Sequence, residues 1–554
     1  LNINTNNQQN SGGTGVVVGY DALARELYAD VVNLRNNATI TLKDNVNLIN
    51  TGTDNNIIKV DVGNTGKITF LGDSNIEGEV GESAKAVNTI NAGAAGKTVT
   101  FDDMVYATNL KYSDAGTVVL NGDTTSNTAE GMVGTVDFDA KAGTLVIGDD
   151  VNIAAKPLGT QFANANDATL AFNGNSVMNE VLGGNTVGNS TFKEIQVGKD
   201  NKTVTFNDDV YTLEKLLVSE NGIVNLKGNL HSDLLFAQNG LVNVDDTKTI
   251  KRSIKTQNDS QGNLNFKGST ALSGEIGTDN KRLNSVKFAS EGTGAYTQSL
   301  GNNIYAVNTT IGNGINNNTI NFDKDITFGG NLDVKDNSTL NIKDSRIIVK
   351  DNLNIADNSK LNFKVYTTDL SAGQAVENGK SGNINTSSLT MASDAKINID
   401  YDGTWEGAGK YNLITSSSST GSYSGTEANG LVKDNSIIDS VVKFDGTNLT
   451  LFADRTGGSS FNANDLYIET SQIGQDYSNG ASQALAGYAN EKKREGALAD
   501  IIRDLEYLEG GRVVSEAKKQ EMIKTQRLLA PTANGSNLQT SITASDLALS
   551  SING

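Results

Sequence analysis

The sequence contains no cysteine, only two prolines (Pro157 and Pro531), one tryptophan and one histidine among its 554 residues. Without cysteine the chain can form no disulfide bond, no thiolate nucleophile and no cysteine-based metal site. This absence suits a large protein that is exported unfolded through a narrow pore, where a disulfide would stop transit. Composition therefore excludes the disulfide-stapled scaffolds and cysteine-dependent enzymes.

Long apolar runs and positive charge are also scarce. No run approaches the roughly 20 apolar residues that a membrane-spanning helix needs. The formal net charge of −19 argues against nucleic acid as a partner, because no basic face could neutralise phosphates over that background. The chain begins in "LNINTNNQQN", without the basic and apolar stretches of a signal peptide. We therefore expect a processed or excised piece of a longer protein, from which export cannot be read directly.

The residues that are abundant favour strands and tight turns. The chain has 58 glycines and is rich in Asn, Asp and Thr, and 37% of its residues are apolar. Thr, Val and Ile alternate with Asn-Gly and Asp-Gly steps, which is typical of many short strands joined by tight turns. This composition predicts a thin, continuous core and not a large helical globule.

The clearest pattern is repetition. "KTVTFDDMVY" at residues 97–106 returns as "KTVTFNDDVY" at residues 202–211, 105 positions later, and a third copy covers residues 318–344. A shorter period of 21 residues separates "KDNSTLNI" at Lys335 from "ADNSKLNF" at Ala356. A unit of that length cannot close its own core, whereas stacked units can cover one another, so the sequence predicts a solenoid.

Within each unit the apolar residues alternate with polar ones, which places one side of a strand inward. The residues expected to face inward are Val99, Phe101, Val204, Phe206, Leu340 and Ile342. The leucine-rich repeat is excluded because its Asn-bearing consensus and its helix in each repeat are absent. We predict an all-β solenoid, a right-handed parallel β-helix with Asn and Gly at its corners.

The two ends differ from the repeats. Helical spacing over Tyr20–Leu34 predicts an N-terminal lead-in and helical cap over residues 1–35, followed by the β-helix stalk over 36–366. Residues 367–455, which contain Trp405, are expected to form a C-terminal β capping region. Residues 456–554 are expected to form a helical segment with a flexible tail. Its apolar stripe is Leu498, Ile501, Ile502, Leu505 and Leu508.

The Asn/Gly-rich coils with "TVTFNDDVY" and "LNFKGSTALSGEIG" resemble the passenger domains of rickettsial surface cell antigens of the outer membrane protein B type. "GAGKYNLI" at residues 407–414 is similar to a segment near the C-terminal end of many autotransporter passengers. The resemblance covers roughly residues 36–455. The helical region 478–530 departs from the usual stalk, so the family's C-terminal boundary does not transfer.

The resemblance implies a type V secreted passenger on the extracellular side of the bacterial outer membrane. Its own C-terminal translocator β-barrel, which we expect outside this chain, would be one partner. Host cell-surface proteins or neighbouring surface-layer subunits would be the others. Family members act as adhesins and as a protective surface protein layer. No cofactor, metal or catalytic residue is implied.

Three carboxylate pairs and the single histidine are the candidates for catalysis. Some polysaccharide-degrading enzymes are β-helices with clustered aspartates, and general acid/base work needs two carboxylates flanking one bond. Adjacent strand residues point to opposite faces, however, so pairs that recur with the repeat favour solvated turns. The candidates are Asp102–Asp103, Asp149–Asp150, Asp208–Asp209 and His231.

Two further motifs come close to known sites. In "NIDYDGTW", Asn398, Asp400, Asp402 and Gly403 match a calcium loop, but position 12 is Gly409 and not glutamate. An Asp-Gly turn after a strand explains them as well. "GGTGVVVG" at residues 12–19 mimics a dinucleotide fingerprint without a preceding strand, and reads as a flexible lead-in.

Two functions are compatible with these observations. The first is a non-enzymatic surface passenger for host-cell adhesion, invasion or a protective layer. In this reading Trp405 and the scattered tyrosines are either an adhesive patch or buried capping residues. The second is a secreted β-helical polysaccharide-degrading enzyme. No catalytic, cofactor-binding or metal-binding residue is predicted with the first function.

Overall fold

The structure is a computed structural model, and its described part consists of strands and turns. The residues described are 2–4, 15–18, 25–35, 37–122, 132–151, 161–184, 190–270, 272–288, 291, 294–366, 380–392, 394–402, 409–419, 438–444 and 447–455. None of these residues lies in a helix. The strands pair in parallel with strands of the neighbouring coil, apart from one antiparallel group near residue 450. The prediction of an all-β parallel solenoid is confirmed.

The chain divides into two compact units, of which the first holds residues 1–292 and 302–309. One of its sheets pairs eleven strands. These strands are β1 (Asn2–Asn4), β4 (Val32–Arg35), β7 (Asn56–Val60), β10 (Glu79–Val80), β13 (Val105–Tyr112), β11 (Val87–Ala92), β8 (Thr65–Phe70), β5 (Thr39–Leu42), β2 (Gly15–Val18), β15 (Met132–Asp137) and β17 (Gln161–Ala163).

A second sheet of the first unit also has eleven strands. These are β3 (Arg25–Ala29), β6 (Val46–Asn50), β9 (Ser74–Ile76), β12 (Thr98–Phe101), β14 (Thr117–Leu120), β16 (Thr144–Ile147), β18 (Thr169–Phe172), β20 (Glu194–Val197), β22 (Lys215–Val218), β24 (Asp233–Phe236) and β26 (Ile254–Thr256). A third row contains β19 (Ser176–Met178), β21 (Thr203–Phe206), β23 (Ile223–Leu226), β25 (Leu241–Val244), β27 (Asn263–Phe266) and β28 (Leu283–Phe288).

The second unit holds residues 293–301 and 310–554, and β30 (Ala306–Ile311) contributes to both units. Five strands form one sheet: β29 (Thr297–Leu300), β31 (Asn318–Phe322), β34 (Ser338–Lys343), β36 (Lys360–Tyr366) and β38 (Lys396–Asp402). The remaining strands are β32 (Ile326–Phe328), β33 (Asn331–Val334), β35 (Arg346–Ile355), β37 (Asn383–Met391), β39 (Gly409–Ser419), β40 (Ile438–Phe444) and β41 (Asn448–Arg455). β41 pairs antiparallel with both β39 and β40.

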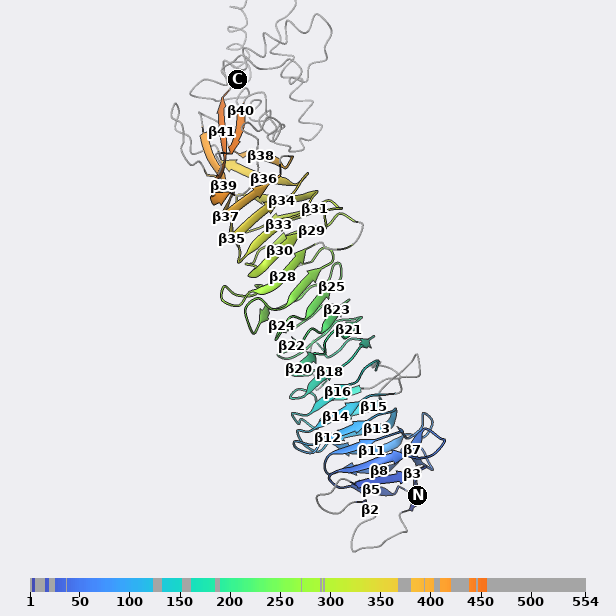
Figure 1. Cartoon of the computed structure of the whole chain (residues 1–554). Helices are drawn as coiled ribbons and strands as arrows, with labels where there is room; N and C mark the ends of the chain where they lie inside the picture. The colour runs from blue at the N-terminus through green and yellow to red at the C-terminus, as the bar shows by residue number, and fades with distance from the viewer. Residues whose placement is uncertain are drawn as a thin grey trace, which may run out of the picture. The chain divides into compact units, whose positions relative to one another are not determined.

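The core is a set of apolar ladders, one side chain from each coil. In the second sheet, registered pairing aligns seven inward residues that are at most 1% exposed. This ladder is Phe101, Leu120, Ile147, Phe172, Val197, Val218 and Phe236. Figure 1 shows the strands β12 to β22 of this sheet stacked one above another. The inward assignment of all six residues named from the sequence is confirmed.

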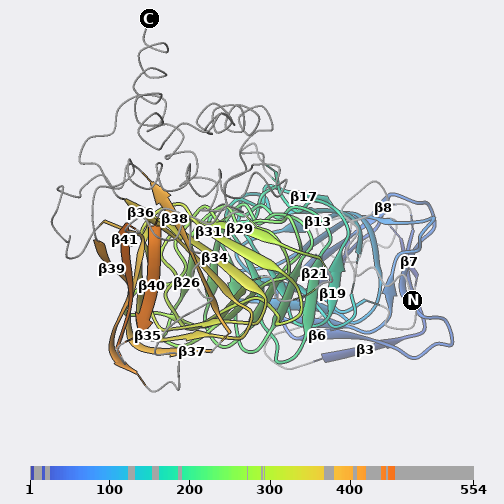
Figure 2. The ribbon, with the colours of Figure 1, turned by 90° about the horizontal axis from the view of Figure 1, so that it is seen from above.

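The 21-residue period and the corner chemistry are confirmed as well. Leu340 of β34 pairs with Leu361 of β36, so equal positions of the short repeat lie in adjacent coils. Figure 2 shows β8 and β6 on different sides of the first unit, with the chain turning between the strands. Several turn asparagines, including Asn45, Asn201 and Asn337, have φ close to +60°. Asparagine tolerates this left-handed conformation better than most residues do.

The predicted N-terminal helix is wrong where the structure describes it. Residues 25–29 and 32–35 form β3 and β4, which pair in parallel with β6 and β7. Leu27, Val31 and Leu34 fit a helical spacing, but Val32 and Leu34 are the residues that are fully buried. The strand period of two residues therefore describes this segment. Stacking on the next coil buries these side chains and provides hydrogen-bond partners for the backbone N–H and C=O groups.

Other predictions stay predictions. The right-handed turn and the domain boundaries after residues 35, 366 and 455 are not decided by the strand pairing. Residues 456–554, including the stripe from Leu498 to Leu508, lie outside the described residues. The same holds for Trp405 and Gly403.

Candidate functional site

The repeated decapeptide begins at a polar corner of the coil. Lys97 Nζ lies 2.7 Å from an Asp44 oxygen and 3.1 Å from an Asp73 oxygen. The Asp44 carboxylate accepts a hydrogen bond from the Asp73 backbone N–H (2.8 Å), and Asp73 accepts one from the Thr98 N–H (2.7 Å). Three successive coils are thus joined by carboxylates. Hydrogen bonds from Lys97 and from the Asp73 backbone hold the pKa of Asp44 below its ordinary value.

The second copy of the decapeptide repeats this arrangement. Lys202 is paired with Asp149, whose carboxylate also accepts a hydrogen bond from the Asn175 N–H (2.8 Å). The Asn175 side chain in turn accepts one from the Thr203 N–H (3.0 Å). Asn175 takes the place that Asp73 has in the first copy. The Lys-Thr start of the decapeptide is therefore a clamp between coils.

The predicted carboxylate pairs do not converge on a shared space. Asp102 accepts hydrogen bonds from the side-chain amides of Asn75 and Asn121, both at 2.8 Å. Asp103 accepts one from the Met104 N–H, and Asp208 accepts one from the Asp209 N–H. Within the described part of the chain, no group of three or more His, Asp or Glu side chains is placed to hold a metal ion.

His231 and Asp209 are the exception, because the fold brings them together. His231 Nε2 lies 2.9 Å from Asp209 Oδ2, and the imidazole stacks on the Tyr211 ring with centroids 4.0 Å apart. Burial raises the pKa of Asp209, but donors from Asn229 and His231 outweigh it, so that this pKa lies below its ordinary value. Burial, followed by the Asp209 charge, raises the pKa of Tyr211. The hydroxyl of the neighbouring Ser232 is fully buried.

Sequence reasoning weighed His231 and Asp209 separately and missed their pairing. The length of one coil could have predicted that these two residues pair. The two residues are 22 positions apart, which is close to one coil, and the bridge between Val210 and Leu230 aligns their neighbours. The register of each coil decides such contacts, and loops of varying length change the register.

A second feature recurs three times and was not expected. Gly81, Gly183 and Gly277 have φ of +77°, +83° and +66°. A Cβ on these glycines would lie 2.4, 2.6 and 2.4 Å from the backbone oxygens of Tyr106, Tyr211 and Tyr305, respectively. The residues before each glycine and tyrosine pair across adjacent coils: Val80 with Val105, Leu182 with Val210, and Ile276 with Ile304. Only glycine fits these positions.

We call each such pair a Gly–Tyr notch, because the tyrosine backbone of the neighbouring coil fills the place that a side chain on the glycine would take. The three tyrosines are all half-buried. Two of the notches are followed by short hairpin turns, closed by the bridges from Glu82 to Lys85 and from Thr278 to Lys281. Tyr106 and Tyr211 close the two copies of the decapeptide, 105 positions apart, whereas Tyr305 lies before the third copy at residues 318–344.

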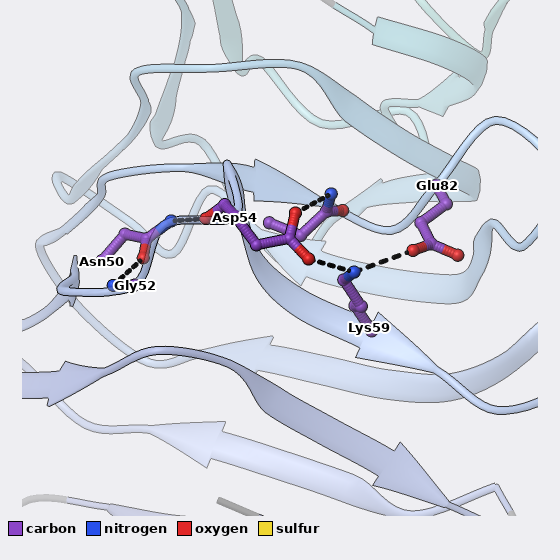
Figure 3. Close-up of polar contacts among 6 residues, drawn as sticks. Asn50, Gly52, Asp54, Lys59 and Glu82 are labelled. Atoms are coloured by element: carbon purple, nitrogen blue, oxygen red, sulfur yellow. Dashed lines mark hydrogen bonds and ion pairs between the residues drawn. The ribbon is translucent and has the colours of Figure 1, made fainter.

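Polar side chains surround the first notch. Lys59 Nζ lies 2.6 Å from Asp54 and 3.1 Å from Glu82, the residue after Gly81 (Figure 3). The hydrogen bond from Lys59 lowers the pKa of Asp54, and the two carboxylates raise the pKa of Lys59. Asn50 fixes the neighbouring turn by accepting from the Gly52 N–H at 2.8 Å and donating to the Asp54 carbonyl at 2.7 Å. The charges at this corner are thus held in place.

The remaining motifs lie on strands. Asn398 and Asp400 belong to β38, and the Asn398 amide donates to Asn362 of the neighbouring strand at 2.7 Å. Residues 403–408, which would complete the calcium loop, lie outside the described residues. Within the dinucleotide-like stretch, Gly15–Val18 form β2, which pairs in parallel with β5.

Comparisons of the chain with protein-family models, curated proteins and solved structures find no match. Among the described residues, no helix is long and apolar enough to cross a membrane.

Proposed function

We propose that this chain is a type V secreted passenger, displayed on the bacterial surface, and that its function is non-enzymatic. Its solenoid would present surface for host-cell adhesion or invasion, or for a protective layer. Host cell-surface proteins or neighbouring subunits are its proposed partners, together with its own translocator β-barrel. The solenoid is proposed to turn right-handedly and to be followed by a helical segment with a flexible tail over residues 456–554.

One observation carries this proposal. In the clamps at Lys97 and Lys202, the ionisable groups at the coil corners are engaged in bonds between coils. A chain that uses its carboxylates to hold a repetitive surface together is suited to display. The resemblance to surface antigen passengers supports the same function.

Binding to cells tests the proposal. Fluorescent protein is incubated with host cells beside an unrelated β-solenoid of similar net charge. We expect saturable binding that exceeds the control and that unlabelled protein competes away. Binding no greater than that of the control solenoid would contradict adhesion and leave the protective surface layer as the proposed function. Electron microscopy of the concentrated protein would reveal such a layer as ordered sheets.

A polysaccharide-degrading enzyme is the second candidate, and one observation favours it. Asp209 and His231 form a close acid–base pair beside the half-buried Tyr211. Screening acidic and neutral polysaccharides with the wild type and with Asp209→Asn separates the two functions. Turnover that the substitution abolishes would overturn the non-enzymatic proposal.

A further inference from the structure

Asn-Gly peptide bonds recur at the corners of the coils and carry a chemical reactivity of their own. Because glycine has no Cβ, its backbone nitrogen can approach the side-chain carbonyl carbon (Cγ) of the preceding asparagine. The described part of the chain contains five such bonds, which begin at Asn121, Asn173, Asn221, Asn239 and Asn313. All five share the reactive dipeptide, so the fold decides which of them can react.

In four of these bonds the glycine is buried. These glycines are Gly122, Gly174, Gly222 and Gly240. A Cβ on Gly174 would lie 2.2 Å from Asp149 Cα, and a Cβ on Gly240 would lie 2.3 Å from Val218 Cγ1. The attack of the glycine nitrogen on Cγ needs rotation of the main chain, and close packing against the adjacent coil opposes that rotation.

The fifth bond, Asn313–Gly314, lies at an open corner between β30 and β31. Gly314 is only half-buried, and a Cβ placed on it would meet no atom of the described residues within 4 Å. Its φ is +80°, and the next residue, Ile315, is 80% exposed. The main chain therefore has room here to bring the Gly314 nitrogen onto Cγ of Asn313.

The side chain of Asn313 is also held in a way that favours attack. Its Oδ1 accepts hydrogen bonds from the backbone N–H groups of Ile315 (3.0 Å) and Asn316 (3.1 Å). These donors stabilise the negative charge that develops on Oδ1 when a nucleophile adds to Cγ. The Asn221 amide instead donates to an Asp200 carboxylate at 2.8 Å, and the nearby negative charge opposes the same step.

We propose that Asn313–Gly314 is a site of spontaneous deamidation. Hydroxide removes the proton of the Gly314 backbone nitrogen, which attacks Cγ of Asn313. The N–Cγ bond forms, the Cγ–Nδ2 bond breaks, and Nδ2 takes a proton from water and leaves as ammonia. Water then opens the cyclic imide at either carbonyl, which gives aspartate or isoaspartate. The net reaction consumes water, releases ammonia and places a carboxylate at this corner.

Incubation of the full chain tests the assignment, and the sequence contains a matched control. Asn221–Gly222–Ile223 and Asn313–Gly314–Ile315 are the same tripeptide. The folded chain is kept at a mildly alkaline pH, sampled over time and digested, and chromatography with mass spectrometry quantifies aspartate and isoaspartate at each bond. A parallel sample is incubated in denaturant. Asn313→Gln is the negative control, and circular dichroism confirms that it is folded.

In the folded chain we expect product at Asn313 to form at least about 10-fold faster than at Asn221, because only the first bond can reach the reactive geometry. The rate at Asn313 should rise with hydroxide concentration, and Asn313→Gln should form no product at this corner. In denaturant the two rates should agree within about 3-fold, because the unfolded tripeptides are identical.

Equal rates at Asn313 and Asn221 in the folded chain would overturn the inference. So would a difference that persists unchanged in denaturant, because it would then not arise from the geometry of the corner. These measurements involve no host cell, so the inference and the proposed function stand or fall separately.

Discussion

At the scale of single residues, outward polar side chains bond from one coil to the next. In the first unit, Asn243 donates to Asn225 at 2.9 Å and receives a hydrogen bond from Asn265 at 3.1 Å. In the second unit, Asn321, Asn341 and Asn362 form a similar ladder with separations of 2.6 and 2.5 Å. Parallel registry places identical amides at the distance that a hydrogen bond needs, so the repeat itself creates the ladder.

Acid sensitivity is predicted from Asp259 and Arg282. The Asp259 carboxylate accepts hydrogen bonds from Arg282 Nε (3.2 Å), Nη2 (3.1 Å) and backbone N–H (2.8 Å), and these hold its pKa well below the ordinary value. A lowered pKa gives stability that is present above the unfolded value of about 3.9 and is lost as the pH falls through the folded value. Asp259→Asn should therefore melt below wild type at pH 7, with a gap that narrows below about pH 4. A gap that widens in acid would refute this assignment.

At the scale of elements, strand alternation could be predicted from the sequence, and so could the solenoid. Val204 and Phe206 alternate with threonines over a single short strand, so their inward direction follows from local pattern alone. The helix expected over Tyr20–Leu34 is wrong for the described residues 25–34, because a short window fits both the helical and the strand period. The pair of Asp209 and His231 could not be predicted, because it depends on register between coils.

Two substitutions at and just after β21 test which side chains face the core and which face solvent. Phe206 is 1% exposed and meets Phe172 edge-to-face at 5.7 Å, whereas Asp208 lies in the exposed turn that follows. Phe206→Asp should lower the free energy of unfolding by roughly 4 kcal/mol or more, since it buries an unpaired charge. Asp208→Ala should cost about 0.5 kcal/mol or less. Chemical denaturation of both variants measures the difference, and the reverse order would contradict the strand assignment.

At the scale of the whole molecule, stability is distributed along a row of coils. In a solenoid each coil contacts its neighbours, so unfolding free energy is approximately a sum of coil and interface terms. Within the described residues, buried apolar side chains recur from coil to coil in both compact units. A two-state analysis with one free energy of unfolding therefore does not suit the full chain.

Hydrogen exchange on two matched core variants tests this distribution. Phe101→Ala lies in the first unit and Leu361→Ala in the second, and both residues are fully buried in the wild type. Each substitution should remove roughly 3 kcal/mol of local stability by leaving a cavity. We expect faster amide exchange in the coils that flank each site, and unchanged protection in the unit that was not substituted. Equal loss of protection across all described strands in either variant would mean that the chain unfolds as one cooperative block. Coupling between neighbouring coils alone would then not explain how the chain unfolds.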